Sequence, residues 1–167
     1  MVYGTKGGQV AILAADRVDE NSLNAMKKAL EAAGAQTKII ASHLGYIAAE
    51  NGKQIIVDQS FLTATSVLFD AVYVPDGAKS ASLLTDEPDA IYFINEAFKH
   101  CKAIAANGAG AYLLDLTAAG TKIRNENKAE KEHMAFGILI NRNSKEFINA
   151  IANHRFWERE KAGNVLD

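Results

Sequence analysis

The segment from Lys102 to Leu114, KAIAANGAGAYLL, joins a short apolar run to an Asn-Gly turn and a stretch of small residues. In an α/β protein this order predicts a strand, a sharp turn and a helix, which is the arrangement of a nucleophile elbow. An elbow holds its turn residue in a strained backbone conformation, so that the side chain stands at the carboxyl edge of the sheet. That residue is Asn107, whose amide cannot replace the Ser or Cys nucleophile. The sequence therefore predicts the architecture of a catalytic site without its reagent.

Two further segments are expected beside this turn, because each also follows a predicted core strand. They are Asp16 to Asp19 and the turn Pro75-Asp76-Gly77. In a working elbow enzyme, Asp19 would supply an acid, and Gly77 with Gly108 would help to bind an oxyanion. The candidate pocket consists of six residues: Asp16, Asp19, Asp76, Gly77, Asn107 and Gly108.

These residues also have structural explanations, which are the preferred interpretation. Asp16 and Asp19 flank the start of a predicted helix, where carboxylates cap backbone N–H groups and are favoured by the helix dipole. Asn107 tolerates a left-handed backbone better than most residue types. No residue is therefore predicted to be catalytic, and Asn107 and Asp19 are interpreted as vestiges of a nucleophile and an acid.

Other nucleophiles and metal ligands give weaker signals. Cys101 falls at the end of a predicted helix on its apolar side, so a buried, unreactive thiol is expected. The four histidines lack metal-ligand spacing and no second cysteine supports them, so no metal site is predicted. No serine lies in a G-x-S-x-G context, and the glycines after residue 106 do not complete a dinucleotide or P-loop fingerprint.

Length, charge and hydropathy exclude several classes of protein. The chain has 167 residues, about half of them apolar, and a net charge of −2. This length suits one domain with a substantial core. Acidic and basic residues are interspersed, so nucleic-acid binding is not expected. No apolar run approaches the roughly 18 residues of a membrane span, and the start MVYGTKGG does not resemble a signal peptide.

Strands and helices alternate along the predicted chain. Five apolar runs are expected to form the sheet, at 9–14, 36–41, 70–74, 103–106 and 136–140. Two short runs around Asn51-Gly52 predict a β-hairpin inserted outside that sheet. Helices are expected after Asp19, from Glu87-Pro88, and from an N-cap at Ser144. The polar segment 118–132 is expected to be a solvated loop or a surface helix.

This alternation predicts a three-layer, flavodoxin-like, doubly wound α/β domain with a mainly parallel sheet. We expect it to span residues 9–160. Residues 1–8 are interpreted as a linker remnant or an added start, and residues 161–167 as a C-terminal tail.

Several segments together resemble the PfpI-like branch of the class I glutamine amidotransferase superfamily. Within that branch they are most similar to the C-terminal domain of large-subunit haem catalases. The segments are LAADRVDENSL (13–23), SHLGYIAAENGKQIIVDQSFLTATSVLFDAVYVPDG (42–77), DAIYFINEAFKHCKAIAANG (89–108) and ANHRFWER (152–159). The combination of the hairpin, the Phe-Asp-Ala-Val-x-Val-Pro motif and the His-Arg-x-Trp tail is fairly specific.

The resemblance assigns family positions to four residues. Asn107 stands where PfpI-like enzymes have their nucleophilic Cys, and Asp19 stands where they usually have Glu. Gly77 corresponds to the second glycine of a Pro-Gly-Gly turn, with Asp76 in place of the first. The change from Cys to Asn argues against protease, deglycase or amidotransferase activity.

The resemblance implies a parent chain that dismutates hydrogen peroxide at a haem held in a preceding catalase core. For this domain it implies a non-catalytic role in stability and homotetramer assembly, and chaperone-like protection of unfolded clients without ATP. Expected partners are the catalase core, tetramer neighbours and unfolded clients; no cofactor is expected in this domain.

Two alternatives remain open. The first is a small-molecule-binding module at the vacant elbow pocket. The second is residual PfpI-like hydrolase or glyoxalase activity with Asp19 or Cys101 recruited. We expect a cytoplasmic protein, with secretion of the parent chain as the alternative.

Overall fold

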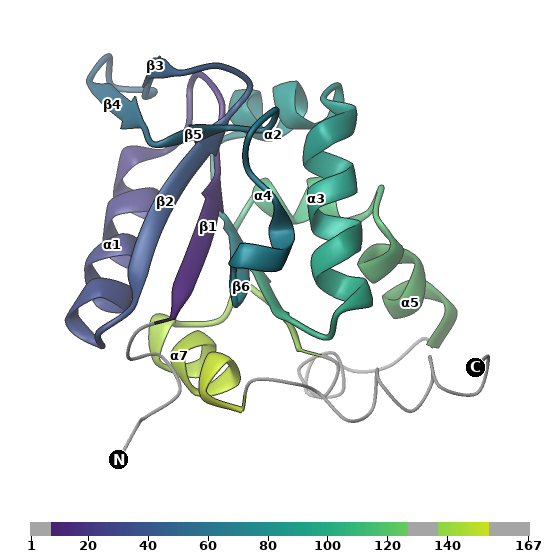
Figure 1. The fold of residues 1–167 in the computed structure, drawn as a ribbon. Helices are drawn as coiled ribbons and strands as arrows, with labels where there is room; N and C mark the ends of the chain where they lie inside the picture. Colours follow the sequence, from purple (N-terminus) through teal and green to yellow (C-terminus); the bar gives the residue numbers. More distant parts are fainter. Residues whose placement is uncertain (1–7, 127–136, 154–167) are drawn as a thin grey trace.

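The computed structural model describes residues 8–126 and 137–153, and Figure 1 draws the remaining residues in grey. Predictions for residues 1–7, for 127–136 and for 154–167 therefore lie outside the described residues. They include most of the predicted linker, part of the polar segment 118–132, Phe136 of the last predicted strand, and the tail.

A six-stranded, fully parallel sheet forms the centre of the described structure (Figure 1). Its strand order is β5-β2-β1-β6-β7-β8. The strands are β1 (Gln9–Leu13), β2 (Gln36–Ala41), β5 (Gln59–Ser60), β6 (Ala71–Val74), β7 (Ala103–Ala106) and β8 (Ile138–Ile140). The predicted doubly wound α/β fold is confirmed. The two-residue β5 was not predicted, because so short a segment has no hydrophobic period.

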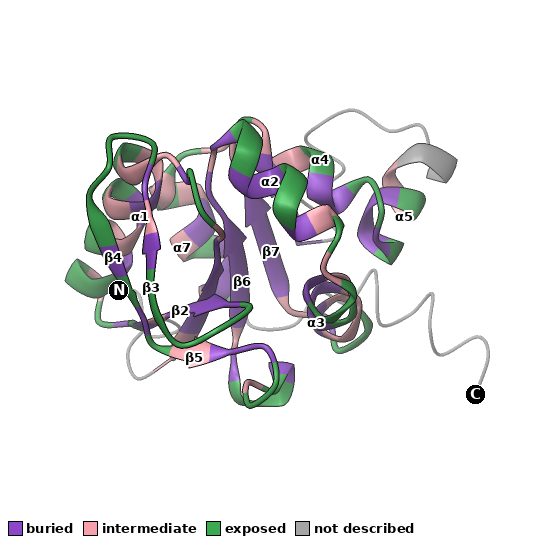
Figure 2. Cartoon of the chain, turned by 90° about the horizontal axis from the view of Figure 1, so that it is seen from above, coloured by how far each residue is buried: buried purple, intermediate pink, exposed green. Residues whose placement is uncertain are grey.

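The strands are buried on both faces, which explains why they read as continuous apolar runs. Every residue of β6 and β7 is buried. Alternate side chains serve two separate cores: Ile12 and Tyr73 point into one, and Leu13 and Val72 point into the other. The sheet is thus the middle of three layers, as Figure 2 shows by its buried colour between the helices.

Helices cover both faces of the sheet. The core on one face contains side chains of α1 (Glu20–Ala32) and α7 (Ser144–Ala152). The core on the other contains side chains of α2 (Ala78–Thr85), α3 (Pro88–Lys99), α4 (Gly110–Leu114) and α5 (Ala118–Glu126). Among the described residues, no helix combines the length and apolar character that crossing a bilayer requires.

Two helix ends and one helix differ from the predictions. The N-cap of α7 is Asn143 rather than Ser144, since the Asn143 side chain accepts a 2.8 Å hydrogen bond from the Glu146 N–H. Helix α3 ends at Lys99, so Cys101 lies beyond it in a left-handed conformation with φ 60°, and it is buried. The eight-residue helix α2, which follows Gly77, was not among the predicted helices.

The predicted hairpin consists of β3 (Gly45–Ala48) and β4 (Gln54–Val57), which pair with each other outside the main sheet. It lies beyond the carboxyl end of β1, at the top of Figure 1. A bridge between Val18 and Ala49 and a 2.9 Å hydrogen bond from the Ala48 N–H to Asp16 Oδ1 attach it there. The insertion is therefore held against the edge where ligands bind in related folds.

The segment from Phe61 to Phe69, which contains the 3-10 helix η1 (Ser66–Leu68), is anchored by its two aromatic ends. Both rings contact Phe93 of α3, with centroid distances of 6.4 and 5.7 Å. Between these anchors, Leu62 is 85% exposed. The backbone is thus fixed while apolar side chains point outward.

The anchoring predicts unequal effects of truncation within one loop. Phe69→Ala should lower the free energy of unfolding by about 3–5 kcal/mol, because it empties a buried aromatic site. Leu62→Ala should change it by less than about 0.5 kcal/mol, because its side chain is already hydrated. Urea denaturation of both variants measures the difference, and similar losses would contradict the described anchoring.

Candidate functional site

Three segments meet at the carboxyl edge of the sheet, as the sequence predicts. The Asp19 N–H donates a 3.0 Å hydrogen bond to the Asp76 carbonyl, joining the segment after β1 to the one after β6. The Ala109 N–H donates a 2.8 Å bond to Asp76 Oδ1, joining the segment after β7. Five of the six candidate pocket residues therefore belong to one cluster, and Asp16 lies apart, at the hairpin.

Asn107 occupies the expected position at the end of β7, but its backbone is not the strained one. Among the described residues, Arg17, Cys101 and Asn141 are the non-glycine residues with positive φ. The left-handed conformation of the turn falls on Gly108, with φ 54°. The prediction of unusual backbone angles at Asn107 is therefore wrong, because the following glycine adopts that conformation at no steric cost.

The Asn107 amide is held by a buried tyrosine. Its Nδ2 donates a 2.8 Å hydrogen bond to the hydroxyl of Tyr73, which is fully buried in β6. The same hydroxyl lies 3.1 Å from Ser22 Oγ, which in turn accepts a 3.0 Å bond from the Asp76 N–H. Asn107 is thus one end of a connected chain of polar groups that reaches α1.

This environment changes the acidity of Tyr73. Burial raises the pKa of the Tyr73 hydroxyl above its ordinary value, and the charges of Asp76 and Asp19 raise it further. The hydrogen bonds with Ser22 and Asn107 act in the opposite direction. Tyr73 is therefore held in its protonated form as a structural hydrogen-bonding group.

The Asp76 carboxylate occupies the backbone donors that could have formed an oxyanion site. Its Oδ1 accepts hydrogen bonds from the N–H of Gly77 at 2.7 Å and of Ala109 at 2.8 Å. It also lies directly over Gly108, where an added Cβ would overlap it. Two N–H groups converging on one oxygen is the geometry that stabilises an oxyanion. Here the oxygen belongs to the protein itself.

One of the two predicted oxyanion donors is confirmed and the other is wrong. Gly77 contributes its N–H, but the second donor is Ala109. The Gly108 N–H instead donates a 2.6 Å hydrogen bond to Asn141 Oδ1, from the segment after β8. Tyr73, Ser22 and Asn141 were missed: Tyr73 reads as an ordinary buried strand residue, and Ser22 as a helix position. Asn141 follows a strand at the same edge, which was an available signal.

The two predicted acidic residues near α1 have structural roles. Asp19 is the N-cap of α1, and its Oδ1 accepts hydrogen bonds from the N–H groups of Asn21 at 2.9 Å and Ser22 at 3.3 Å. Asp16 binds the hairpin backbone. The capping interpretation is thus confirmed for Asp19. Within residues 8–126 and 137–153, no group of three or more His, Cys, Asp and Glu side chains could hold a metal ion.

The sequence is similar to that of long catalases. Residues 6–161 match the family described as the C-terminal domain found in long catalases. Catalase HPII of Mycobacterium avium is 37% identical over 158 residues, which are 90% of this chain and 22% of that protein. Catalase-2 of Bacillus subtilis is 37% identical over 153 residues, 90% of this chain and 21% of that protein. The chain thus spans about a fifth of the length of these relatives.

Solved structures with the same fold belong to the DJ-1 and ThiJ/PfpI proteins. Schizosaccharomyces pombe DJ-1 has a TM-score of 0.66 at 13% identity, with 86% of this chain and 87% of that chain covered. A ThiJ/PfpI domain protein from Brachyspira murdochii has a TM-score of 0.65 at 20% identity, with 89% and 96% covered. At these identities the likeness shows the fold alone.

The Tyr73 hydroxyl gives a pH-dependent prediction. Tyr73→Phe should lower the free energy of unfolding at pH 7 by about 1–3 kcal/mol, because it leaves the half-buried Asn107 amide without its acceptor. An unfolded tyrosine ionises near pH 10, and the folded state raises that pKa. The unfolded chain therefore releases this proton first, so stability is full below pH 10 and falls above it.

The Tyr73→Phe variant should lose the part of the decline in stability above pH 10 that comes from ionisation of this hydroxyl. Urea denaturation between pH 7 and pH 11 measures it, with Tyr112→Phe as the control because Tyr112 is 68% exposed. If the Tyr73 variant and the control both follow the unmodified chain at every pH, the described hydrogen bonds do not exist in solution.

Proposed function

Because the chain belongs to the family of C-terminal domains found in long catalases, we propose that it is a non-catalytic accessory domain. In this proposal it stabilises a catalase core and the homotetramer that the core forms. The proposal assigns peroxide dismutation to the core and assigns no chemical step to this domain.

The observation that carries the proposal is that the polar groups of the elbow already form hydrogen bonds within the chain. We call this the internally occupied elbow. The position of a nucleophile holds Asn107, whose amide is bonded to Tyr73. The N–H groups of Gly77 and Ala109 are both bonded to the Asp76 carboxylate. An acyl-transfer enzyme needs a nucleophile and free donors at this place, and the described contacts use both for structure.

Haem is assigned to the catalase core in this proposal. Haem binding needs an axial ligand in a large and mostly apolar site. Three cavities of the described structure hold about 250, 270 and 320 Å³, and each is lined by two carboxylates. This lining does not suit a haem, which supports placing the haem in the core.

The elbow alternatives have less support. A small-molecule-binding module would need free polar groups at the elbow, whereas the Asn107 amide and the N–H groups of Gly77 and Ala109 already bond within the chain. Asp16 does border a cavity of 250 Å³, but that cavity lies beside Ser42, His43 and Glu87. Residual hydrolase or glyoxalase activity through Cys101 would need an accessible thiolate, and Cys101 is buried.

Chaperone-like protection is the second candidate function. Large apolar side chains are exposed on the hairpin, on the segment 61–69 and near α4, and such side chains can hold unfolded segments. Suppression of the aggregation of a heated client, unaffected by ATP and greater than that of an inert protein of equal size, would support it.

Restoring the missing reagent tests the internally occupied elbow. Asn107→Cys alone should give no turnover of ester, peptide or glyoxal substrates, because the oxyanion donors still bond to Asp76. Adding Asp76→Gly removes a negative charge beside the introduced thiol, which favours its thiolate. We therefore expect iodoacetamide to alkylate that thiol about tenfold faster in the double variant.

The matched control pairs Asn107→Cys with Asp16→Gly, since Asp16 lies at the hairpin away from the elbow. Mass spectrometry separates alkylation at position 107 from alkylation at Cys101. Turnover by the single variant, or equal alkylation rates in all three proteins, would show that Asp76 does not occupy the donors.

Exchange of domains tests the accessory role. In Bacillus subtilis Catalase-2, the segment similar to this chain would be replaced by this chain, and compared with the same catalase lacking that segment. The chimera should stay tetrameric and lose peroxide consumption about tenfold more slowly on heating, the equivalent of ~1.4 kcal/mol of interface free energy. An unrelated α/β domain of equal size is the control, and equal protection by it would sink the proposal.

A further inference from the structure

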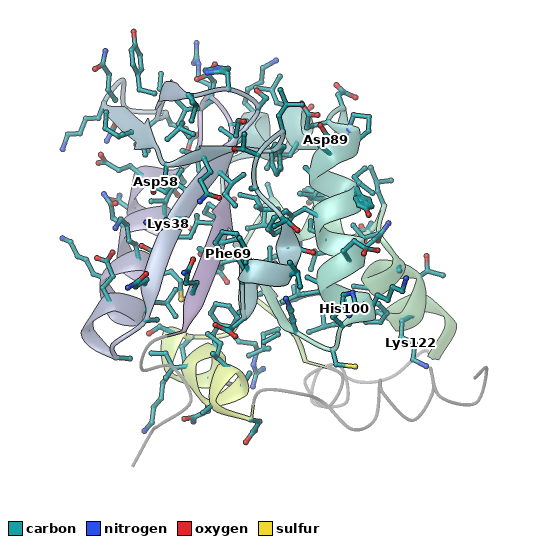
Figure 3. The ribbon with its side chains drawn as sticks, viewed as in Figure 1. Lys38, Asp58, Phe69, Asp89, His100 and Lys122 are labelled. Atoms are coloured by element: carbon teal, nitrogen blue, oxygen red, sulfur yellow. The ribbon has the colours of Figure 1, made fainter. Side chains whose placement is uncertain are left out.

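A groove runs along α3, between that helix and the anchored segment 61–69. On the helix side it is lined by Asp89, Tyr92 and Glu96 of α3 and by its C-cap His100, and on the loop side by Phe61 and residues 64–67. Its volume is about 270 Å³. Figure 3 shows Asp89 and His100 near opposite ends of α3. We call this hollow the α3 groove.

The helical wall of the α3 groove is one face of α3. Its members Asp89, Tyr92, Glu96 and His100 are spaced by three, four and four residues, which places them in a row along one side of a helix. Eleven residues of helix correspond to a row of about 16 Å. The groove is therefore long enough for a short extended segment or a turn of helix.

The loop wall combines apolar side chains with Thr65 and Ser66, and it is fixed in position. Val67 lines the groove and is 67% exposed, and the neighbouring Leu62 and Leu68 add exposed apolar surface beside it, at 85% and 62%. The backbone beneath them is held by Phe61 and Phe69 against Phe93, and by a 2.6 Å hydrogen bond from Lys102 Nζ to the Ser66 carbonyl. A surface that is apolar and already ordered loses little entropy on binding, which is the property of a preformed interface.

The charge of the α3 groove defines its occupant. Asp89 and Glu96 place two carboxylates in the row, with the 59% exposed ring of Tyr92 between them. Glu96 lies 3.9 Å from His100, and that histidine is its cationic partner only when protonated. Lys102 donates a hydrogen bond from its Nζ to the Ser66 carbonyl of the loop. The groove thus presents negative charge and an aromatic face together.

We propose that the α3 groove docks a segment of the catalase core that carries an arginine flanked by apolar residues. A guanidinium can stack on Tyr92 while it donates to Glu96 or Asp89, and a lysine cannot make that planar contact. The flanking apolar side chains would cover Val67 and Leu68. This inference rests on the proposed accessory function and identifies the surface through which it acts.

Charge and polarity reversal in the chimeric Catalase-2 test the inference. Val67→Lys and Glu96→Lys each introduce a cation into the α3 groove. Both side chains are at least partly exposed, so the melting temperature of the 167-residue chain alone should stay unchanged. In the chimera each variant should speed heat inactivation about tenfold relative to the unmodified domain, the scale of losing one interface anchor.

Matched control variants lie on the hairpin. Ile56→Lys and Glu50→Lys make the same changes at exposed apolar and acidic positions away from α3, and should leave the inactivation rate unchanged. Hydrogen exchange adds a direct readout, because amides of residues 62–68 should exchange about tenfold more slowly in the chimera than in the 167-residue chain.

The outcomes separate the two proposals. If the unmodified domain does not slow inactivation of Catalase-2, the accessory function fails and the docking inference with it. If the domain slows inactivation but the groove variants act no differently from the hairpin variants, the accessory function stands and the α3 groove is overturned as its surface. Slower exchange confined to the hairpin would overturn it in the same way.

Discussion

Asp76 is the residue on which the carboxyl edge of this domain depends. Its carbonyl accepts from the Asp19 N–H at the start of α1, and its own N–H donates to Ser22 Oγ one turn later. Its carboxylate accepts from Gly77 and Ala109, which precede α2 and α4. Through its backbone and its side chain together, this one residue thus joins the beginnings of three helices, where backbone N–H groups would otherwise lack partners.

The same contacts satisfy the backbone donors of the elbow turn from within the chain. An elbow turn is costly to maintain, since it brings several backbone donors to one place with water as their main acceptor. A carboxylate at position 76 satisfies two of these donors from within the chain. The polar chain through Tyr73 and Asn107 then extends these internal hydrogen bonds to Ser22 of α1.

The sequence predicted the elements of this fold better than the details of its site. Continuous apolar runs identify β6 and β7 because parallel strands are buried on both faces, and the Asn-Gly turn identifies the hairpin. Strand β5 has two residues, and no local signal could have found it. The sequence predicted which segments meet at the carboxyl edge of the sheet. It could not predict which groups form hydrogen bonds there, because that depends on distances of a few ångströms. For example, the N–H of Ala109 donates to Asp76 while the N–H of Gly108 donates to Asn141, and this difference depends on the left-handed backbone at Gly108.

The burial of Cys101 affects how well such a domain resists oxidation. The first oxidation of a cysteine by peroxide yields a sulfenic acid, and it requires a thiolate that the oxidant can reach. Cys101 is 6% exposed, beneath the end of α3, and Met26 is 4% exposed in the opposite core. A domain attached to a peroxide-consuming enzyme would therefore keep both of these sulfur atoms shielded from the substrate of its neighbour. Its packing would change little through repeated exposure, and reductive repair at these two positions would seldom be required.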